Sequence, residues 1–188
     1  MKSVFKSGLK SGLKSGLKSG LKSGTLCITF AVAALTAASA QAVDAKAWAG
    51  GLLGLTVPSA NGTTSRSQYG LTAGAKVGTE LGVGVYYLSS QKTEDGIGAY
   101  NFDLYGAQVG YHFEGEADGV FIAGRIGTSK VGPNNLSPMN IGVVAGYDYL
   151  LSEHLSLGGE VSYMSIAASG NQGGFTTLGF LAALKLWL

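Results

Sequence analysis

The stretch that decides the fold is NIGVVAGYDYLLSEHLSLGGEV, residues 140–161. Every second position in its first half is apolar or aromatic, and small or polar residues stand between. The first set is Ile141, Val143, Ala145, Tyr147 and Tyr149, and the second is Asn140, Gly142, Gly146 and Asp148. A period of two residues is typical of a β-strand with two different faces. A polar turn at 151–154 and a second alternating run from Leu155 follow, so the stretch predicts an antiparallel hairpin.

The same period recurs through the rest of the chain. It predicts eight strands, at residues 46–57, 68–77, 80–90, 100–113, 120–130, 140–150, 155–167 and 175–188. Short connections alternate with longer ones, and all three prolines, Pro58, Pro133 and Pro138, fall in the longer set. Because proline cannot donate a hydrogen bond to a strand ladder, its positions support these boundaries independently. Each strand is long enough to cross a bilayer at a tilt.

The two faces of these strands differ in a way that suits lipid. One face is apolar, and the other consists of glycine, small polar and a few ionic residues. A soluble barrel would need a richly charged exterior, whereas only 13% of the residues are charged and 46% are hydrophobic. Because backbone within lipid must close all its hydrogen bonds, the strands have to form a closed barrel. The sequence therefore predicts an all-β protein, an eight-stranded antiparallel up-and-down transmembrane β-barrel.

The first 42 residues have the pattern of a signal peptide. Six lysines precede an apolar core at 26–38, and small residues end in Ala40-Gln41-Ala42, which fits a cleavage site after Ala42; cleavage after Ala40 is the alternative. The unit Lys-Ser-Gly-Leu repeats within the basic part, which we interpret as an expanded basic region rather than a functional cationic peptide. The expected domains are thus a signal peptide with these repeats, 1–42, and an outer-membrane β-barrel domain, 43–188.

Charge and composition exclude several classes of function. Without the six leader lysines, the formal charge changes from +2 to about −4, which argues against nucleic acid as a partner. The chain contains one cysteine, Cys27, and two histidines, His112 and His154. These are too few for a disulfide framework or a thiolate metal site, and they leave little for a zinc centre. We expect no metal and no cofactor.

Aromatic residues favour a membrane position for the barrel. Tyr111, Phe113, Tyr147 and Tyr149 fall near the short-turn end of their strands, and Tyr69, Tyr87, Tyr163 and Phe175 fall near the longer loops. Two aromatic girdles, one at each membrane interface, are typical of transmembrane barrels.

Two stretches carry a resemblance to the small outer-membrane β-barrel family of OmpA- and OmpX-type proteins. They are VGYHF at 109–113, which closes a strand before a short turn, and the hairpin at 146–161. The resemblance covers essentially the whole chain after the leader, although the last strand ends in leucine where the family typically has an aromatic residue. It implies the outer membrane of a Gram-negative cell envelope, contact with outer-membrane lipid and lipopolysaccharide, insertion by the outer-membrane assembly machinery, and a monomer.

A polar network is expected inside the barrel, because eight strands leave room only for their own side chains. Counting across hairpins places Lys76 near Glu80, and Arg125 at the depth of Glu160. The candidate lumen residues, all with a structural role, are Lys76, Glu80, Gln108, Arg125, Asp148, Glu160 and Lys185. An unpaired buried charge is costly, so ion pairs are expected. We interpret them as a plug rather than an ion path.

No catalytic residue is predicted. His154-Leu155-Ser156 with Glu160 is similar to the His-x-Ser spacing of outer-membrane lipid A deacylases, but the rest of that motif is absent. The predicted function is therefore an outer-membrane barrel with a structural or surface-exposed role and a side-chain-filled lumen, and not an enzyme. The alternative is a narrow, porin-like conduit for small or apolar solutes, and a remote alternative is a lipid-modifying enzyme.

Overall fold

The computed structural model describes residues 46–59, 65–91, 101–113, 118–131, 136–170 and 173–188. These residues form eight strands: β1 (Ala47–Pro58), β2 (Arg66–Val77), β3 (Leu81–Gln91), β4 (Phe102–His112), β5 (Gly119–Val131), β6 (Met139–Ser152), β7 (Leu155–Ile166) and β8 (Phe175–Trp187). The eight strands predicted from the period of two are confirmed. The leader, Pro133 and the expected start of the fourth strand at Tyr100 lie outside the described residues.

Most strand boundaries differ from the prediction by one or two residues, and two of these differences have a local reason. β6 continues to Ser152, because a register shift between Leu150 and Ser152 extends the ladder with β7 into the expected turn. β1 includes Pro58 as its last residue, opposite Thr177 of β8. A proline is tolerated at the end of a strand, where its missing N–H interrupts no ladder.

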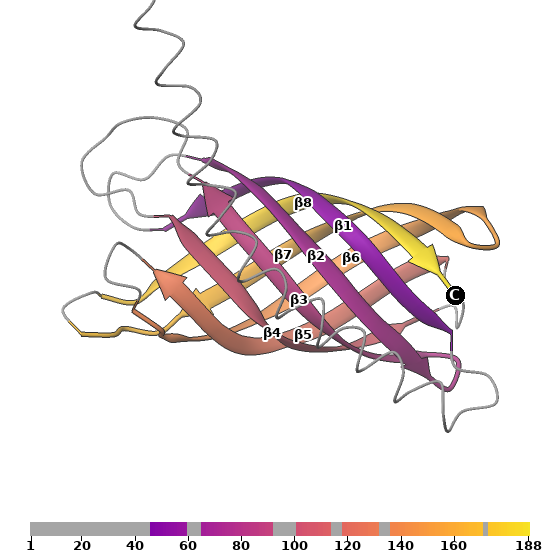
Figure 1. The fold of residues 1–188 in the computed structure, drawn as a ribbon, viewed down its shortest axis with the longest axis horizontal. Coiled ribbons are helices and arrows are strands. Elements are labelled where there is room, and N and C mark those ends of the chain that lie inside the picture. Colours follow the sequence, from indigo (N-terminus) through magenta and orange to yellow (C-terminus); the bar gives the residue numbers. More distant parts are fainter. Residues whose placement is uncertain (1–45, 60–64, 92–100, 114–117, 132–135, 171–172) are drawn as a thin grey trace, which may run out of the picture.

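Antiparallel pairing of each strand with its chain neighbour, and of β1 with β8, closes the sheet into a barrel (Figure 1). Following the register once around the barrel from Trp48 leads back to Pro58, a stagger of ten residues along β1. A stagger of this kind tilts the strands by roughly 40° from the barrel axis. All backbone groups of the ladder therefore have partners without a free sheet edge.

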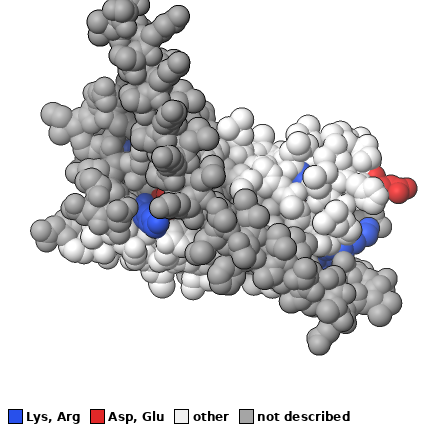
Figure 2. Space-filling model, viewed as in Figure 1, with Lys and Arg blue, Asp and Glu red and all other residues white. Residues whose placement is uncertain are grey.

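The outer wall of the barrel is an apolar band. On β6 every outward position from Met139 to Leu151 is apolar or aromatic. A strand of that length, tilted by roughly 40° from the barrel axis, spans about 30 Å along the axis. This matches the hydrocarbon core of a bilayer. Charged atoms on the visible face gather mainly toward the two ends of the barrel (Figure 2). No helix in the described ranges is long and apolar enough to cross a membrane.

Aromatic side chains mark both margins of this band. Tyr111, Phe113, Tyr147 and Tyr149 face outward near the short turns, each at least 39% exposed. Near the loops, Tyr69 and Tyr163 also face outward, at 42% and 51%.

Phe175 lies near the loops as expected, but it does not belong to the outer aromatic girdle. Its ring packs inside the barrel, 5.6 Å from that of Phe102, because it shares the inward parity of Thr177. Tyr105, which lies opposite Tyr87 in the ladder, occupies the outer position near the loops instead.

Apolar side chains fill the lumen at two levels. Toward the loops, an apolar cluster crosses the barrel: Leu52, Tyr86, Leu88, Phe102, Leu104, Val131, Met164, Ile166, Leu181 and Ala183. Toward the short turns, Trp48 and Trp187 pack together with ring centroids 5.8 Å apart. Trp48 fits because Gly74 faces it, and a Cβ on Gly74 would lie 2.4 Å from the indole ring. Charged residues occupy the space between these two levels.

Candidate functional site

Arg125 lies at the centre of the polar lumen. Its guanidinium forms a two-point ion pair with Glu160, with nitrogen to oxygen distances of 2.9 and 3.1 Å, and both side chains are at most 3% exposed. Nε donates a hydrogen bond to Gln108 Oε1 at 3.1 Å, and the guanidinium carbon stands 5.1 Å from the ring centroid of Tyr86. Strands β3, β4, β5 and β7 bring these groups together, because each of the four residues faces the inside of the barrel.

Neutral side chains extend this pair across the lumen. Gln108 Nε2 donates to Thr72 Oγ1 at 3.0 Å, which links the pair to β2. On the loop side, the Tyr86 hydroxyl donates to Asn140 Oδ1 at 2.5 Å, and Asn140 Nδ2 donates to Ser129 Oγ at 3.0 Å. Hydrogen bonds of this kind satisfy polar groups that would otherwise be costly to bury.

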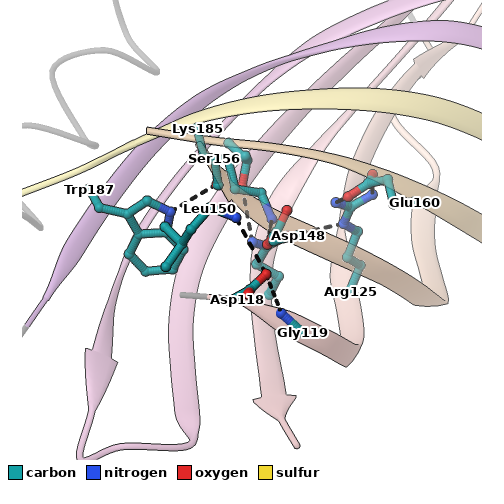
Figure 3. A network of polar contacts seen from close by, with 11 residues as sticks. Asp118, Gly119, Arg125, Asp148, Leu150, Ser156, Glu160, Lys185 and Trp187 are labelled. Atoms are coloured by element: carbon teal, nitrogen blue, oxygen red, sulfur yellow. Dashed lines mark hydrogen bonds and ion pairs between the residues drawn. The ribbon is translucent and has the colours of Figure 1, made fainter. Parts of the chain in front are cut away.

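A second ion pair lies nearer the short turns (Figure 3). Lys185 Nζ and Asp148 Oδ2 are 2.5 Å apart, and the same ammonium stands 4.4 Å from the ring centroid of Phe121. Below it, the Trp187 indole N–H donates to Ser156 Oγ at 3.0 Å. The described residues therefore include two buried ion pairs at successive depths.

Six of the seven predicted lumen residues face inward, and Glu80 does not. Glu80 lies in the exposed turn before β3, and its carboxylate accepts a hydrogen bond from the outward-facing Tyr111. The expected pairing of Lys76 with Glu80 is absent from the ion pairs of the described residues. Lys76 Nζ instead donates to the Thr79 carbonyl at 3.1 Å and stands 5.7 Å from the Trp187 ring. Side chains alternate between the two faces only within a strand. Counting residues across the hairpin therefore gave the wrong direction for Glu80, which lies in the turn.

Several lumen residues were missed by the sequence reasoning. Tyr86, Asn140, Ser129, Thr72 and Ser156 all stand on the inward face of their strands. The alternation along each strand predicts that these side chains face inward. The contacts between them depend on the ten-residue stagger of the whole barrel, which the sequence of a single hairpin does not reveal. They join strands that are distant in the chain.

The His-x-Ser spacing does not form a nucleophile with its base. His154 lies exposed in the turn between β6 and β7, and its Nδ1 is 3.1 Å from the Trp187 carbonyl oxygen. Ser156 is buried and its hydroxyl is occupied by the Trp187 indole. No group of three or more His, Cys, Asp or Glu side chains that could hold a metal ion occurs within the described part of the chain.

A closed barrel of eight tilted strands, with an apolar exterior and ion pairs inside, is the architecture of a small outer-membrane protein. The family description "Outer membrane protein beta-barrel domain" matches residues 30–185, and the chain belongs to this family. The expected location in the outer membrane is thereby confirmed. No curated protein sequence gives a significant match.

Solved structures of other small barrels are similar to this chain, and the first of them has the same fold. Neisserial surface protein A is 15% identical, with a TM-score of 0.60 over 76% of this chain and 96% of that one. The N-terminal barrel domain of Pseudomonas aeruginosa OprF is 14% identical, with a TM-score of 0.48 over 74% and 96%. Ail, the attachment invasion locus protein of Yersinia pestis, is 12% identical, with a TM-score of 0.47 over 75% and 97%.

Proposed function

We propose that this chain is a monomeric, non-catalytic outer-membrane barrel with a structural or surface-exposed role and a lumen closed by its own side chains. The Arg125–Glu160 pair carries the proposal, because it joins β5 to β7 inside the lumen at a depth that an ion path would have to pass. The apolar cluster on its loop side adds a second barrier. A surface role is also in keeping with the name of Neisserial surface protein A.

Single-channel recording of the refolded mature protein in a planar bilayer tests the closed lumen. We expect no conductance steps above those of the lipid alone. Well-defined steps would refute the proposal and favour the alternative, a narrow conduit. The chain from Thr72 through Gln108 to Arg125 is the observation that favours this alternative, since it lines part of the lumen with polar groups.

Catalysis on lipid is the remote alternative. The hydrogen-bond partners speak against it, because His154 Nδ1 faces the Trp187 carbonyl and the Ser156 hydroxyl accepts from the Trp187 indole. Mass spectrometry of lipid A from cells expressing the protein should show no new species, and a Ser156→Ala variant should give the same spectrum. A modified lipid A present with the protein and absent with the variant would contradict the non-catalytic role.

The proposal also covers the lipids that surround the barrel and the machinery that inserts it. Lipopolysaccharide and phospholipid would contact the apolar band, and the outer-membrane assembly machinery would insert the chain after removal of residues 1–42. The mass of the mature protein tests that boundary: we expect a first residue at Val43, and a start at Gln41 would indicate the alternative cleavage site.

A further inference from the structure

A small cavity lies inside the barrel between the ion pairs and the short turns. Its lining includes Trp48, His112, Arg125, Glu160, Lys185 and Trp187. About 20 Å³ of it is open to the centres of water molecules, which is room for one or two of them. The lining mixes apolar side chains with charged and polar ones, whereas cavities that remain dry in proteins are lined by apolar groups alone.

One buried polar atom in this lining lacks a well-formed hydrogen bond within the protein. The His112 side chain is 6% exposed, and its Nδ1 makes no hydrogen bond of good geometry. The ring is held by packing, with centroids 5.5 Å from Phe121 and 6.4 Å from Trp187. A buried polar atom without a partner is unfavourable, so the cavity has both the room and the chemical need for a small hydrogen-bonding guest.

On the loop side of the cavity the lumen side chains are fully enclosed. Leu88, Leu104, Ser129 and Asn140 are each 0% exposed. In contrast, residues around the cavity retain a little accessible surface: Trp48 5%, Phe121 6%, Ala123 7% and Lys185 6%. This difference places the barrier to water at the level of the apolar cluster, beyond the Arg125–Glu160 pair.

We propose that the cavity is a hydrated blind pocket, in which one or two water molecules hydrogen-bond to His112 Nδ1 and exchange with the solvent at the short-turn end. The exchange occurs past the lining side chains at the short-turn end of the cavity, which are Trp48, Trp187, His112 and Phe121. The proposal rests on the closed lumen proposed above, and it adds that the two halves of the lumen differ in their access to water.

A high-resolution crystal structure of the refolded mature protein tests the occupant. We expect an ordered water within hydrogen-bond distance of His112 Nδ1, and no xenon in the cavity after pressurisation with that gas. An empty cavity, or one that takes up xenon, would overturn the proposal.

The side of entry is tested by two cysteine variants. The only cysteine of the chain, Cys27, lies in the leader, so the mature protein offers no competing thiol. Ala123→Cys places a thiol in the cavity. Ser129→Cys places a thiol, similar in size to the native hydroxyl, among the fully enclosed side chains on the loop side. Both are exposed to silver ions in chloride-free buffer, and the remaining thiols are counted after unfolding. We expect Ala123→Cys to react at least tenfold faster.

Each other outcome refutes the proposal. A faster reaction at Ser129→Cys indicates entry from the loops, equal rates indicate a continuous water path, and the absence of reaction at both indicates a sealed cavity. Leu104→Cys replaces Ser129→Cys if the latter fails to fold, as judged by its gel migration before heating. Conductance measured on the same preparations separates the two proposals, because an ion current refutes the closed lumen, whereas equal rates without current refute only the blind pocket.

Discussion

Replacement of Arg125 by methionine should be among the most damaging single changes in the lumen. The substitution removes both contacts to Glu160, at 2.9 and 3.1 Å, and leaves that carboxylate charged with its side chain 3% exposed. Breaking a buried ion pair by removing one partner costs about 3 to 5 kcal/mol, because the remaining charge is uncompensated. Gln108 Oε1 also loses its donor, which adds about 1 kcal/mol.

The double variant Arg125→Met with Glu160→Gln isolates the ion pair. It removes the stranded charge, while the losses at Gln108 and at the Tyr86 ring persist. We therefore expect the double variant to be more stable than Arg125→Met alone by roughly 2 kcal/mol, since replacing both partners of a buried pair is often close to neutral.

The free energy of unfolding is measured with urea in lipid vesicles for the unmodified protein, Arg125→Met, Glu160→Gln and the double variant. These four values give the coupling energy between the two residues. If the losses of the two single variants simply add, the ion pair contributes no coupling energy and the reasoning is refuted. A gain of ion current in Arg125→Met without loss of stability would instead indicate that the pair obstructs a conduit.

Three further predictions concern the barrel as a whole. The unboiled protein should migrate differently from the boiled protein on a detergent gel, because a closed barrel resists unfolding by detergent; identical migration together with solubility in plain buffer would contradict the membrane assignment. Val161→Arg, near the middle of the apolar band, should cost about 2 to 4 kcal/mol, whereas Thr128→Arg, near the loops, should cost about 0 to 1 kcal/mol in urea unfolding; the reverse order would contradict the assigned depths. Gly74→Ala should destabilise the barrel by about 1 to 3 kcal/mol through overpacking against Trp48 and should shift tryptophan emission; unchanged stability and emission would show that the indole can move at no cost.

The strands and their faces were predictable because both are local properties. Alternation such as that from Ile141 to Tyr149 depends only on neighbours in the chain, and one buried face fixes its phase. Closure also followed from sequence, since lipid tolerates no free strand edge.

Contacts between distant strands were predictable only where parity and depth agreed. Arg125 and Glu160 share both, and the structure brings them together. Glu80 was misplaced because it belongs to a turn, where alternation no longer determines the direction of a side chain. The bond from Tyr86 to Asn140 joins β3 to β6, and its prediction would have required the stagger of the whole barrel.

The position of the two tryptophans has a consequence for studying how the protein assembles. Trp48 stands near the start of β1 and Trp187 at the end of β8, so they are separated by almost the whole barrel sequence and meet only across the last seam. Pairing of all the other neighbours is possible without them. Their mutual approach is therefore a native optical signal of the final step of assembly, and kinetic fluorescence can distinguish formation of the hairpins from completion of the cylinder with no label attached.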